Sequence, residues 1–350
     1  MPSTAFSTML AATMTARRPK INEQIFTDHP LWKKLYTGGQ IREWTEGGEE
    51  MEGIISAGYN STFGARDYKS PITRREVDPL LLAKIDSREL SGAVSWYDHQ
   101  EESNSSSQTA IVNFTNALLD NGRDSMQNVL ALELWESGTG EHLHGFGAIL
   151  HHHNTYMNIN RVTAANAYWR ANHTDATHPS ITRTFGTGAP SFTCGPYHTQ
   201  EPLVIRGGTD GGLTKIYDDC CSNGGTDSPD VICMPYDLYD KCRALLEAER
   251  MQVQPNKAMA DLGWPDNFQF RGAAVVWDRN VTAGDVLFLN TKYLEIMPYK
   301  GYRGGPVVTE PLSALAADGV YLNTVYMKWR GNLVCWKPQR FGKLTGKTVA

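Results

Sequence analysis

One stretch of the sequence, residues 106–137, constrains the fold more than any other, because its apolar residues recur at helical spacing. Most of them lie three or four positions apart, at Ile111, Phe114, Leu118, Met126, Val129, Leu130 and Leu134. Ser105–Ser107 offer N-caps before this stretch, and Gly138 and Gly140 offer helix stops after it. At about 1.5 Å per residue such a helix would span roughly 45 Å. A helix of this length needs a sheet to pack on.

The middle of this stretch leaves two interpretations open. Asn121 and Gly122 are poor helix formers. The stretch is therefore either one buried core helix or two helices separated by a bend or a break at these residues. We favour the single helix.

The composition excludes several classes of protein. A chain of 350 residues suggests about two domains. Apolar content of 41%, charged content of 20% and a net charge of −5 are typical of a soluble globular protein and offer no strongly basic surface for nucleic acid. No apolar run approaches the roughly 18 residues of a transmembrane helix. The 32 glycines and 15 tyrosines indicate many turns and a substantial β content.

The cysteines show no spacing that suggests a zinc or redox motif. They are Cys194, Cys220, Cys221, Cys233, Cys242 and Cys335. We expect reduced, packed thiols in a protein made in the cytosol.

The N-terminal 22 residues contain no acid and include the basic cluster Arg17, Arg18 and Lys20. This pattern fits either a targeting peptide or an arm that reaches a neighbouring molecule. We favour the arm.

Residues 37–79 form a glycine-rich, charged excursion with short alternating runs, which is typical of a long two-stranded hairpin. Few of its residues suit anchoring to its own subunit, and a loop of this length usually has a function, such as lying on a partner. Residues 80–97 then read as one strand with a kink at Ser91–Gly92.

The second half of the chain alternates helix and strand. Residues 173–203 are rich in Thr, Pro and Gly and are predicted to form a surface loop. Two helices, 211–221 and 235–250, then flank a buried strand at 230–234, which indicates an α/β module. Strands are expected at 268–277, 285–290, 293–298, 321–328 and 332–337, with a hairpin turn at Arg330–Gly331 between the last two.

No pattern predicts an active site. His142, His144 and His151–His153 offer imidazoles to a zinc or iron ion, but their spacing matches no metal motif. No Gly-x-Ser-x-Gly and no phosphate-binding loop occur. The carboxylates at 218–219 and 227–230 are interpreted as solvated charge. We therefore assign no catalytic, cofactor-binding or metal-binding residue and no cofactor.

The chain resembles the major capsid proteins of tailed bacteriophages, which have the Hong Kong 97-like fold. The resemblance lies in the order of its elements: a basic arm, a long hairpin, a long helix, an α/β insertion and closing strands. The resemblance covers nearly the whole chain. Its sharpest local marks are NRVTAANAYWRAN at 160–172, GAAVVWDRNVTAGDVLFLNTKYLEI at 272–296 and KWRGNLVCWKPQRFGKLTG at 328–346.

The resemblance implies an α+β fold with five parts. These are an N-terminal arm (1–36), an extended hairpin called the E-loop (37–79), a peripheral domain (80–202) with a spine helix (106–137), an α/β axial domain (203–318), and C-terminal strands (319–350) that return to the peripheral domain. Lys69 in the E-loop is the lysine to test for an isopeptide cross-link, although a lone loop lysine is usually solvated.

The function that the resemblance implies is structural rather than enzymatic. Copies of the chain would assemble as hexamers and pentamers into an icosahedral head shell around double-stranded DNA, which they would contact without specificity. Scaffolding, portal and decoration proteins are candidate partners, no membrane is involved, and the shell would assemble in the host cytoplasm and end in the virion. Two alternatives stay open: a metal-dependent enzyme that uses His142–His153, and a secreted or organellar β-rich binding protein.

Overall fold

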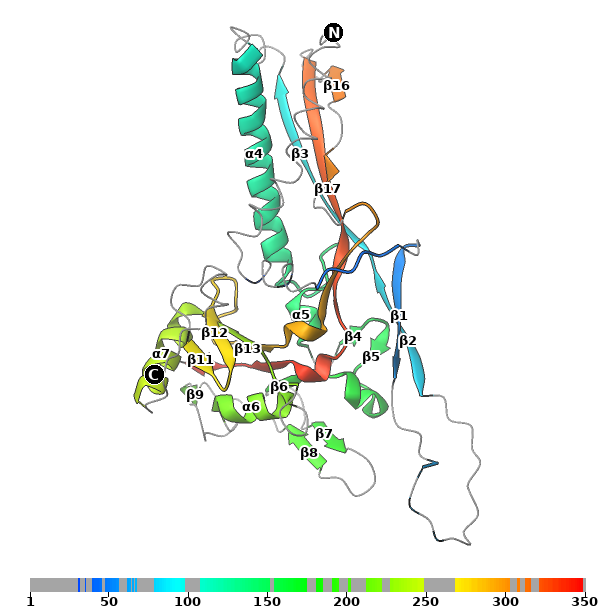
Figure 1. Ribbon diagram of the computed structural model, residues 1–350, viewed down its shortest axis with the longest axis vertical. Helices are drawn as coiled ribbons and strands as arrows, with labels where there is room; N and C mark the ends of the chain where they lie inside the picture. The colour runs from blue at the N-terminus through cyan, green and yellow to red at the C-terminus, as the bar shows by residue number, and fades with distance from the viewer. Residues whose placement is uncertain are drawn as a thin grey trace.

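The structure is a computed structural model in which the strands gather in two larger sheets and several two-stranded ribbons (Figure 1). Its fold class is mixed α+β, as predicted. It describes residues 31, 35, 40–45, 48–56, 62–63, 65, 67, 79–97, 108–151, 154–174, 181–184, 191–194, 201–202, 212–221, 227–248, 268–302, 307–308, 312–315 and 321–348. None of the helices in these ranges is long and apolar enough to cross a membrane.

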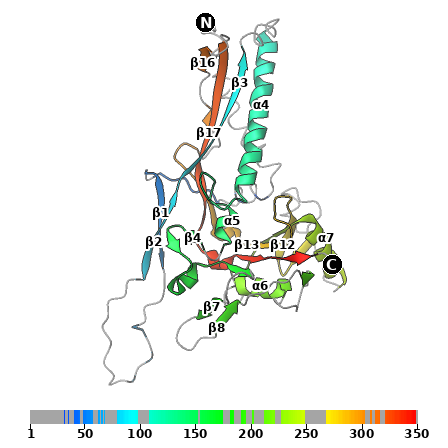
Figure 2. The ribbon, with the colours of Figure 1, turned by 180° about the vertical axis from the view of Figure 1, so that it is seen from behind.

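The first sheet is built on β17 (Tyr321–Cys335), a strand of 15 residues. β3 (Arg88–Tyr97) runs antiparallel to it from Gly331 to Leu322. β14 (Leu294–Pro298) pairs with the C-terminal end of β17, and β15 (Val307–Val308) and β16 (Leu312–Leu315) pair with its N-terminal half. The pair β3–β17 therefore forms a long ribbon that extends away from the rest of the molecule (Figures 1 and 2).

The hairpin predicted at Arg330–Gly331 is wrong, because both residues lie inside β17. A Cβ atom on Gly331 would lie 2.7 Å from the carbonyl oxygen of Met297 and 2.7 Å from the ring of Trp329. The glycine thus permits the close approach of β14 and does not make a turn.

The kink predicted at Ser91–Gly92 is also wrong. The stretch divides earlier, at Ser87, into β2 (Leu80–Asp86) and β3. β2 pairs with β1 (Glu50–Ser56), whereas β3 pairs with β17, so the change of partner sets the boundary.

The predicted long helix is confirmed as α4 (Gln108–Glu133), which runs unbroken for 26 residues beside β3 and β17 (Figures 1 and 2). A Cβ atom on Gly122 would lie 2.5 Å from Val94 Cγ2 and 3.2 Å from Met327 Cε. Gly122 therefore brings the helix close to the sheet and does not break it. The predicted N-caps, Ser105–Ser107, lie outside the described residues.

The apolar stripe of α4 is largely confirmed where its side chains are described. The stripe residues that are at least 95% buried are Met126, Leu130 and Leu134, together with Leu119, which the periodicity did not select. Leu118 packs partly buried against the small core of Trp96, Val325 and Met327. Val129, by contrast, is 42% exposed, so its place in the predicted stripe is wrong.

After α4 the chain folds back on the end of the helix. Phe146 N donates to the carbonyl oxygen of Leu134 at 2.6 Å and begins the short helix α5 (Phe146–Ile149). Gly138 and Gly140 have positive φ angles of 72° and 67°, as expected of left-handed residues, but they lie in the loop beyond the helix end.

The second sheet has six strands in the order β11-β12-β10-β13-β18-β6. The pairs β10–β12 and β18–β6 are parallel, and the other pairs are antiparallel. Its strands are β11 (Phe268–Phe270), β12 (Ala273–Trp277), β10 (Val231–Met234), β13 (Val286–Leu289), β18 (Gly342–Leu344) and β6 (Asn172–Thr174). The sheet therefore joins three distant parts of the chain.

Two helices complete the core of this sheet, α6 (Gly212–Cys220) and α7 (Tyr236–Ala248). Ile216 and Leu238 from these helices share a buried cluster with Val275 and Phe288 of the strands. The predicted helices at 211–221 and 235–250 and the buried strand between them are confirmed.

Two further predictions in this half are wrong. The stretch 268–277 is a hairpin, because Arg271 and Gly272 take positive φ and reverse the chain between β11 and β12. The predicted loop at 173–203 contains described strands, namely β7 (Ile181–Thr184), β8 (Ser191–Cys194) and β9 (Glu201–Pro202), the last of which pairs with β19 (Lys347–Thr348). The 3₁₀ segments are η1 (Ala164–Trp169), η2 (Thr291–Tyr293) and η3 (Pro338–Arg340).

The motif at 160–172 contains a buried charged side chain, Arg161, although the next residue, Val162, is 57% exposed. Arg161 is fully buried; its Nη1 donates to the carbonyl oxygens of Ala148 and Ile149 at 3.0 and 3.1 Å. Its guanidinium also lies 4.6 Å from the centre of the Tyr156 ring. Burial lowers the pKa of Arg161 to about 10. The short strands β4 (Thr155–Tyr156) and β5 (Ile159–Asn160) pair with each other immediately before Arg161.

Candidate assembly surfaces

The ribbon β1–β2 has one buried and one exposed face. Opposite partners in an antiparallel pair share a face, so Met51 and Ile85 lie on one side and Ile54 and Leu82 on the other. The first pair is 2% and 3% exposed. On the second face, Ile54 is 72%, Leu80 54% and Leu82 46% exposed. The ribbon therefore presents a row of apolar side chains to solvent.

The base of the ribbon is fixed to its own subunit. A Cβ atom on Gly53 would lie 2.2 Å from the ring of Trp336, so the glycine lets the indole lie against the ribbon backbone. Trp336 Nε1 in turn donates to Glu295 Oε2 at 2.8 Å. This anchoring corrects the expectation that residues 37–79 have few contacts with their own subunit.

The segment before β1 is anchored as well. Arg42 N and Trp44 N donate to the carbonyl oxygens of Ile296 and Pro298 at 3.1 and 2.9 Å. Trp44 is 6% exposed, and Leu31 and Leu35 from the predicted arm are 5% and 0% exposed. The rest of the arm and most of the predicted E-loop, including Lys69, lie outside the described residues.

Charges gather at the base of the exposed face and leave its outer half apolar. Lys84 Nζ lies 3.1 Å from Glu50 and 2.6 Å from Glu52. Hydrogen bonds to Glu52 and then Glu50 raise the pKa of Lys84. A two-stranded ribbon is only marginally stable alone, and exposed apolar patches on an ordered element commonly mark interaction sites. The outer half of this ribbon is therefore a candidate docking surface.

Two smaller apolar surfaces lie elsewhere. On α4, Val129 and Leu132 are 42% and 54% exposed. Near the second sheet, Tyr236 and Trp277 are 60% and 51% exposed and form an edge-to-face pair with ring centres 5.7 Å apart. Both surfaces lie far from the ribbon in the sequence.

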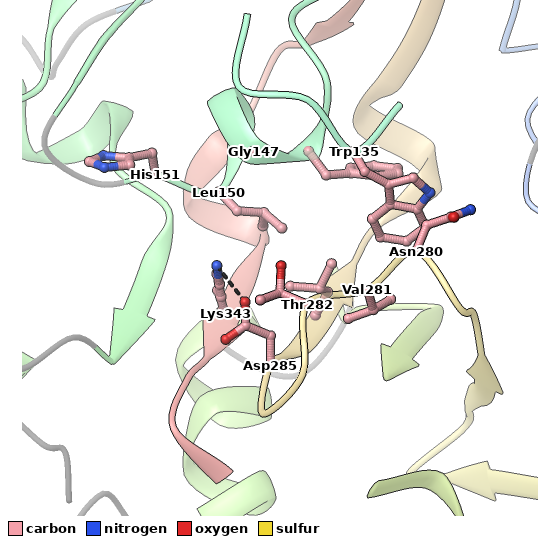
Figure 3. Close-up of a pocket in the computed structure, with 11 residues that line it drawn as sticks. Trp135, Gly147, Leu150, His151, Asn280, Val281, Thr282, Asp285 and Lys343 are labelled. Atoms are coloured by element: carbon pink, nitrogen blue, oxygen red, sulfur yellow. Dashed lines mark ion pairs between the residues drawn. The ribbon is translucent and has the colours of Figure 1, made fainter. Parts of the chain in front are cut away.

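The histidines proposed as metal ligands have other partners. His142 Nδ1 pairs with Glu133 Oε1 at 2.8 Å, which raises the pKa of the imidazole. His144 packs edge-on against Tyr156, and burial lowers its pKa. His151 lies at the rim of a cleft (Figure 3). No group of three or more metal-binding side chains occurs in the described ranges, which leave out His152 and His153.

The carboxylates interpreted as solvated also have partners in the structure, and Asp218 is exposed as predicted. Asp230 accepts hydrogen bonds from Thr291 N at 2.8 Å and from Thr291 Oγ1 at 2.5 Å. Asp218 pairs with Arg271, and Asp227 pairs with Lys292 at 3.0 Å. These contacts hold the turns around the second sheet.

The predicted reduced cysteines are confirmed where the side chains are described. Free thiols occur at Cys220, Cys221, Cys233, Cys242 and Cys335. Burial raises the pKa of Cys242 and of Cys335 to about 12, so both remain protonated and inert near neutral pH.

Comparisons with known proteins give similarity in structure only. No protein-family model matches the sequence, and no curated protein matches it. A chain of the cyanophage A-1(L) capsid asymmetric unit has a TM-score of 0.60 at 13% identity, covering 88% of this chain and 90% of that one. A capsid chain of a native GTA particle has a TM-score of 0.55 at 11% identity, covering 90% and 91%.

A third similar structure is not named as a phage component. It is the holo-SrpI encapsulin complex from Synechococcus elongatus PCC 7942, with a TM-score of 0.50 at 9% identity and coverage of 90% and 88%. At these identities the likeness concerns the fold, and it extends over nearly the whole length of each chain. The chain therefore shares its overall fold with chains of these three assemblies.

Proposed function

We propose that this chain is the major capsid protein of a tailed bacteriophage. In this proposal it has the Hong Kong 97-like fold, in which α4 is the spine helix and the ribbon β1–β2 is the stem of the E-loop. The domain division is proposed as arm 1–36, E-loop 37–79, peripheral domain 80–202, axial domain 203–318 and C-terminal strands 319–350. Copies assemble as hexamers and pentamers into an icosahedral shell around double-stranded DNA, and the chain has no catalytic role.

The observation that carries this proposal is the two-faced ribbon. Its base is anchored on Trp336, while Ile54, Leu80 and Leu82 are about half exposed or more. Covering the exposed parts of these side chains on a second copy would contribute roughly 1 kcal/mol each. Contacts of this size are weak singly, but symmetry repeats them around every capsomer.

The remaining partners follow from this role. Scaffolding, portal and decoration proteins are proposed partners, DNA is contacted without specificity, and assembly takes place in the host cytoplasm. The net charge of −5 agrees with an interior that encloses DNA without binding it tightly.

The test places a charge on the exposed face. Leu82→Asp should leave the subunit folded, because Leu82 is 46% exposed and is not among the buried core residues, but should abolish shells on sedimentation and negative-stain imaging. Leu82→Met, which keeps an apolar side chain, is the matched control and should assemble. Normal shells from Leu82→Asp would show that the face is not an interface.

A second candidate is a shell that is not part of a virus, because the same fold occurs in an encapsulin. Purified particles distinguish the two. Nuclease-protected double-stranded DNA inside them supports the phage proposal, and an enclosed protein without DNA supports the second candidate.

A further inference from the structure

A cleft lies where the end of α4 and α5 meet the turn between β12 and β13 (Figure 3). Its apolar lining comes from Trp135, Phe146, Leu150, Val281 and Leu287. It encloses about 100 Å³. An engineered apolar cavity of about 150 Å³ binds benzene, so a cleft of this size suits one phenyl ring or one branched aliphatic group.

One end of the cleft carries an ion pair. Lys343 Nζ lies 2.7 Å from Asp285 Oδ2, and the exposed Thr282 stands beside the pair at the rim (Figure 3). The two charges are not equally accessible, because the side chain of Lys343 is 26% exposed and that of Asp285 only 9%. A ligand that enters the cleft therefore meets the ammonium more readily than the carboxylate.

The ammonium of Lys343 can bind a further group. It has three N–H donors, and among the residues that the structure describes Asp285 is its only partner. The hydroxyl of Thr282 offers one more donor at the same end. A carboxylate can accept these hydrogen bonds, and hydrogen bonds between ionised groups are the strong ones. A cationic head group would instead be repelled by the ammonium.

We propose that this cleft is a binding site for a small carboxylic acid that carries one aromatic or branched aliphatic group. Its carboxylate binds Lys343 Nζ and Thr282 Oγ1, and its apolar group lies against Trp135 and Leu287. The lining comes from the α4–α5 end of the molecule and from the second sheet, so the bound acid contacts both. This site goes beyond the proposed function and does not depend on assembly.

The first test compares three probes of similar size on the wild-type chain and on the unassembled Leu82→Asp subunit. Benzoate, benzyl alcohol and benzylamine share the ring and differ in the charge of the head group. In ligand-observed NMR titrations, benzoate should bind about fivefold tighter than benzyl alcohol, as expected of one partly exposed ion pair, and benzylamine should bind most weakly. Benzoate should also raise the thermal unfolding midpoint, because it binds only the folded chain. Benzoate binding no tighter than that of benzyl alcohol, or no binding at millimolar concentration, would overturn the inference.

The second test locates the site. Thr282→Trp lets a rim residue fill the cleft and should abolish binding of benzoate and benzyl alcohol. Ala283→Trp, at an exposed neighbour outside the cleft, is the matched control and should bind both probes like wild type. Unchanged benzoate binding by Thr282→Trp would place the probe elsewhere and contradict the site.

The third test isolates the charge. Lys343→Met alone would remove the counter-charge of the buried Asp285, so both members of the pair are replaced together. Lys343→Met/Asp285→Leu should keep the affinity for benzyl alcohol and lose the preference for benzoate. An unchanged preference in this double variant would show that Lys343 does not bind the carboxylate.

Discussion

Replacement of Gly122 by alanine should have two effects of opposite sign on the free energy of unfolding. In an exposed helix interior, Gly→Ala stabilises by about 0.8–1.0 kcal/mol. Here the new Cβ would lie 2.5 Å from Val94 Cγ2, which is well inside contact distance. Val94 is β-branched and stiff at χ1, so relief requires a shift of the helix or the strand. Overpacking of this kind costs typically 1–3 kcal/mol.

The steric cost should therefore exceed the helical gain, and Gly122→Ala should lower the free energy of unfolding by about 1 kcal/mol. Chemical unfolding of the subunit, with Leu82→Asp in the background to prevent assembly, measures it. The double variant Gly122→Ala/Val94→Ala removes the clash, so a double-mutant cycle should show a coupling of about 1 kcal/mol in favour of the pair. A stabilising Gly122→Ala, or the absence of coupling, would refute the close packing of α4 on β3.

Three other predictions follow from described contacts. Leu130→Asp should cost several kcal/mol and prevent folding, because Leu130 is 4% exposed and the charge would have no partner; a folded variant in circular dichroism would contradict the buried stripe. Deletion of residues 57–78 should leave a folded subunit that forms no shells, and loss of folding would mean that these residues belong to the core. Glu133 raises the pKa of His142 in the folded state. Below about pH 6.5, the ordinary pKa of histidine, the wild type should therefore be more stable than His142→Gln. This difference in stability should disappear as the pH rises through the raised pKa of His142. Unfolding midpoints from pH 5 to 9 test this, and a pH-independent difference would disprove the ion pair.

The sequence predicts elements well where periodicity alone decides them. The long helix α4, the helices α6 and α7 and the buried strand β10 each have a repeating apolar pattern long or dense enough to be read without tertiary context. The apolar face of each of these elements can be predicted without knowing which element it packs against.

Glycine explains one of the errors and one of the alternatives that the sequence leaves open. Gly331 was interpreted as part of a turn, and Gly122 as a possible helix break, but both are glycines because another element approaches their backbone closely. The sequence does not distinguish such a contact from a turn. The charge of Asp230 was misread for a similar reason, since its partner Thr291 lies 61 residues away in the sequence.

The candidate surfaces were only partly predictable. Alternation in residues 50–56 indicates a strand, but its exposed face is apparent only when its pairing with β2 places Ile54 beside Leu82. The cleft could not be predicted from the sequence, because Trp135, Val281 and Lys343 come together only in the folded chain.

The central claim is that this chain closes into shells through the exposed face of β1–β2. Sedimentation and negative-stain imaging of the purified wild-type chain, beside Leu82→Asp, test it most directly. The account predicts capsomers or closed shells of hundreds of kilodaltons or more from wild type and a folded, unassembled subunit from the variant. A wild-type chain that stays a stable monomer at high concentration would contradict it.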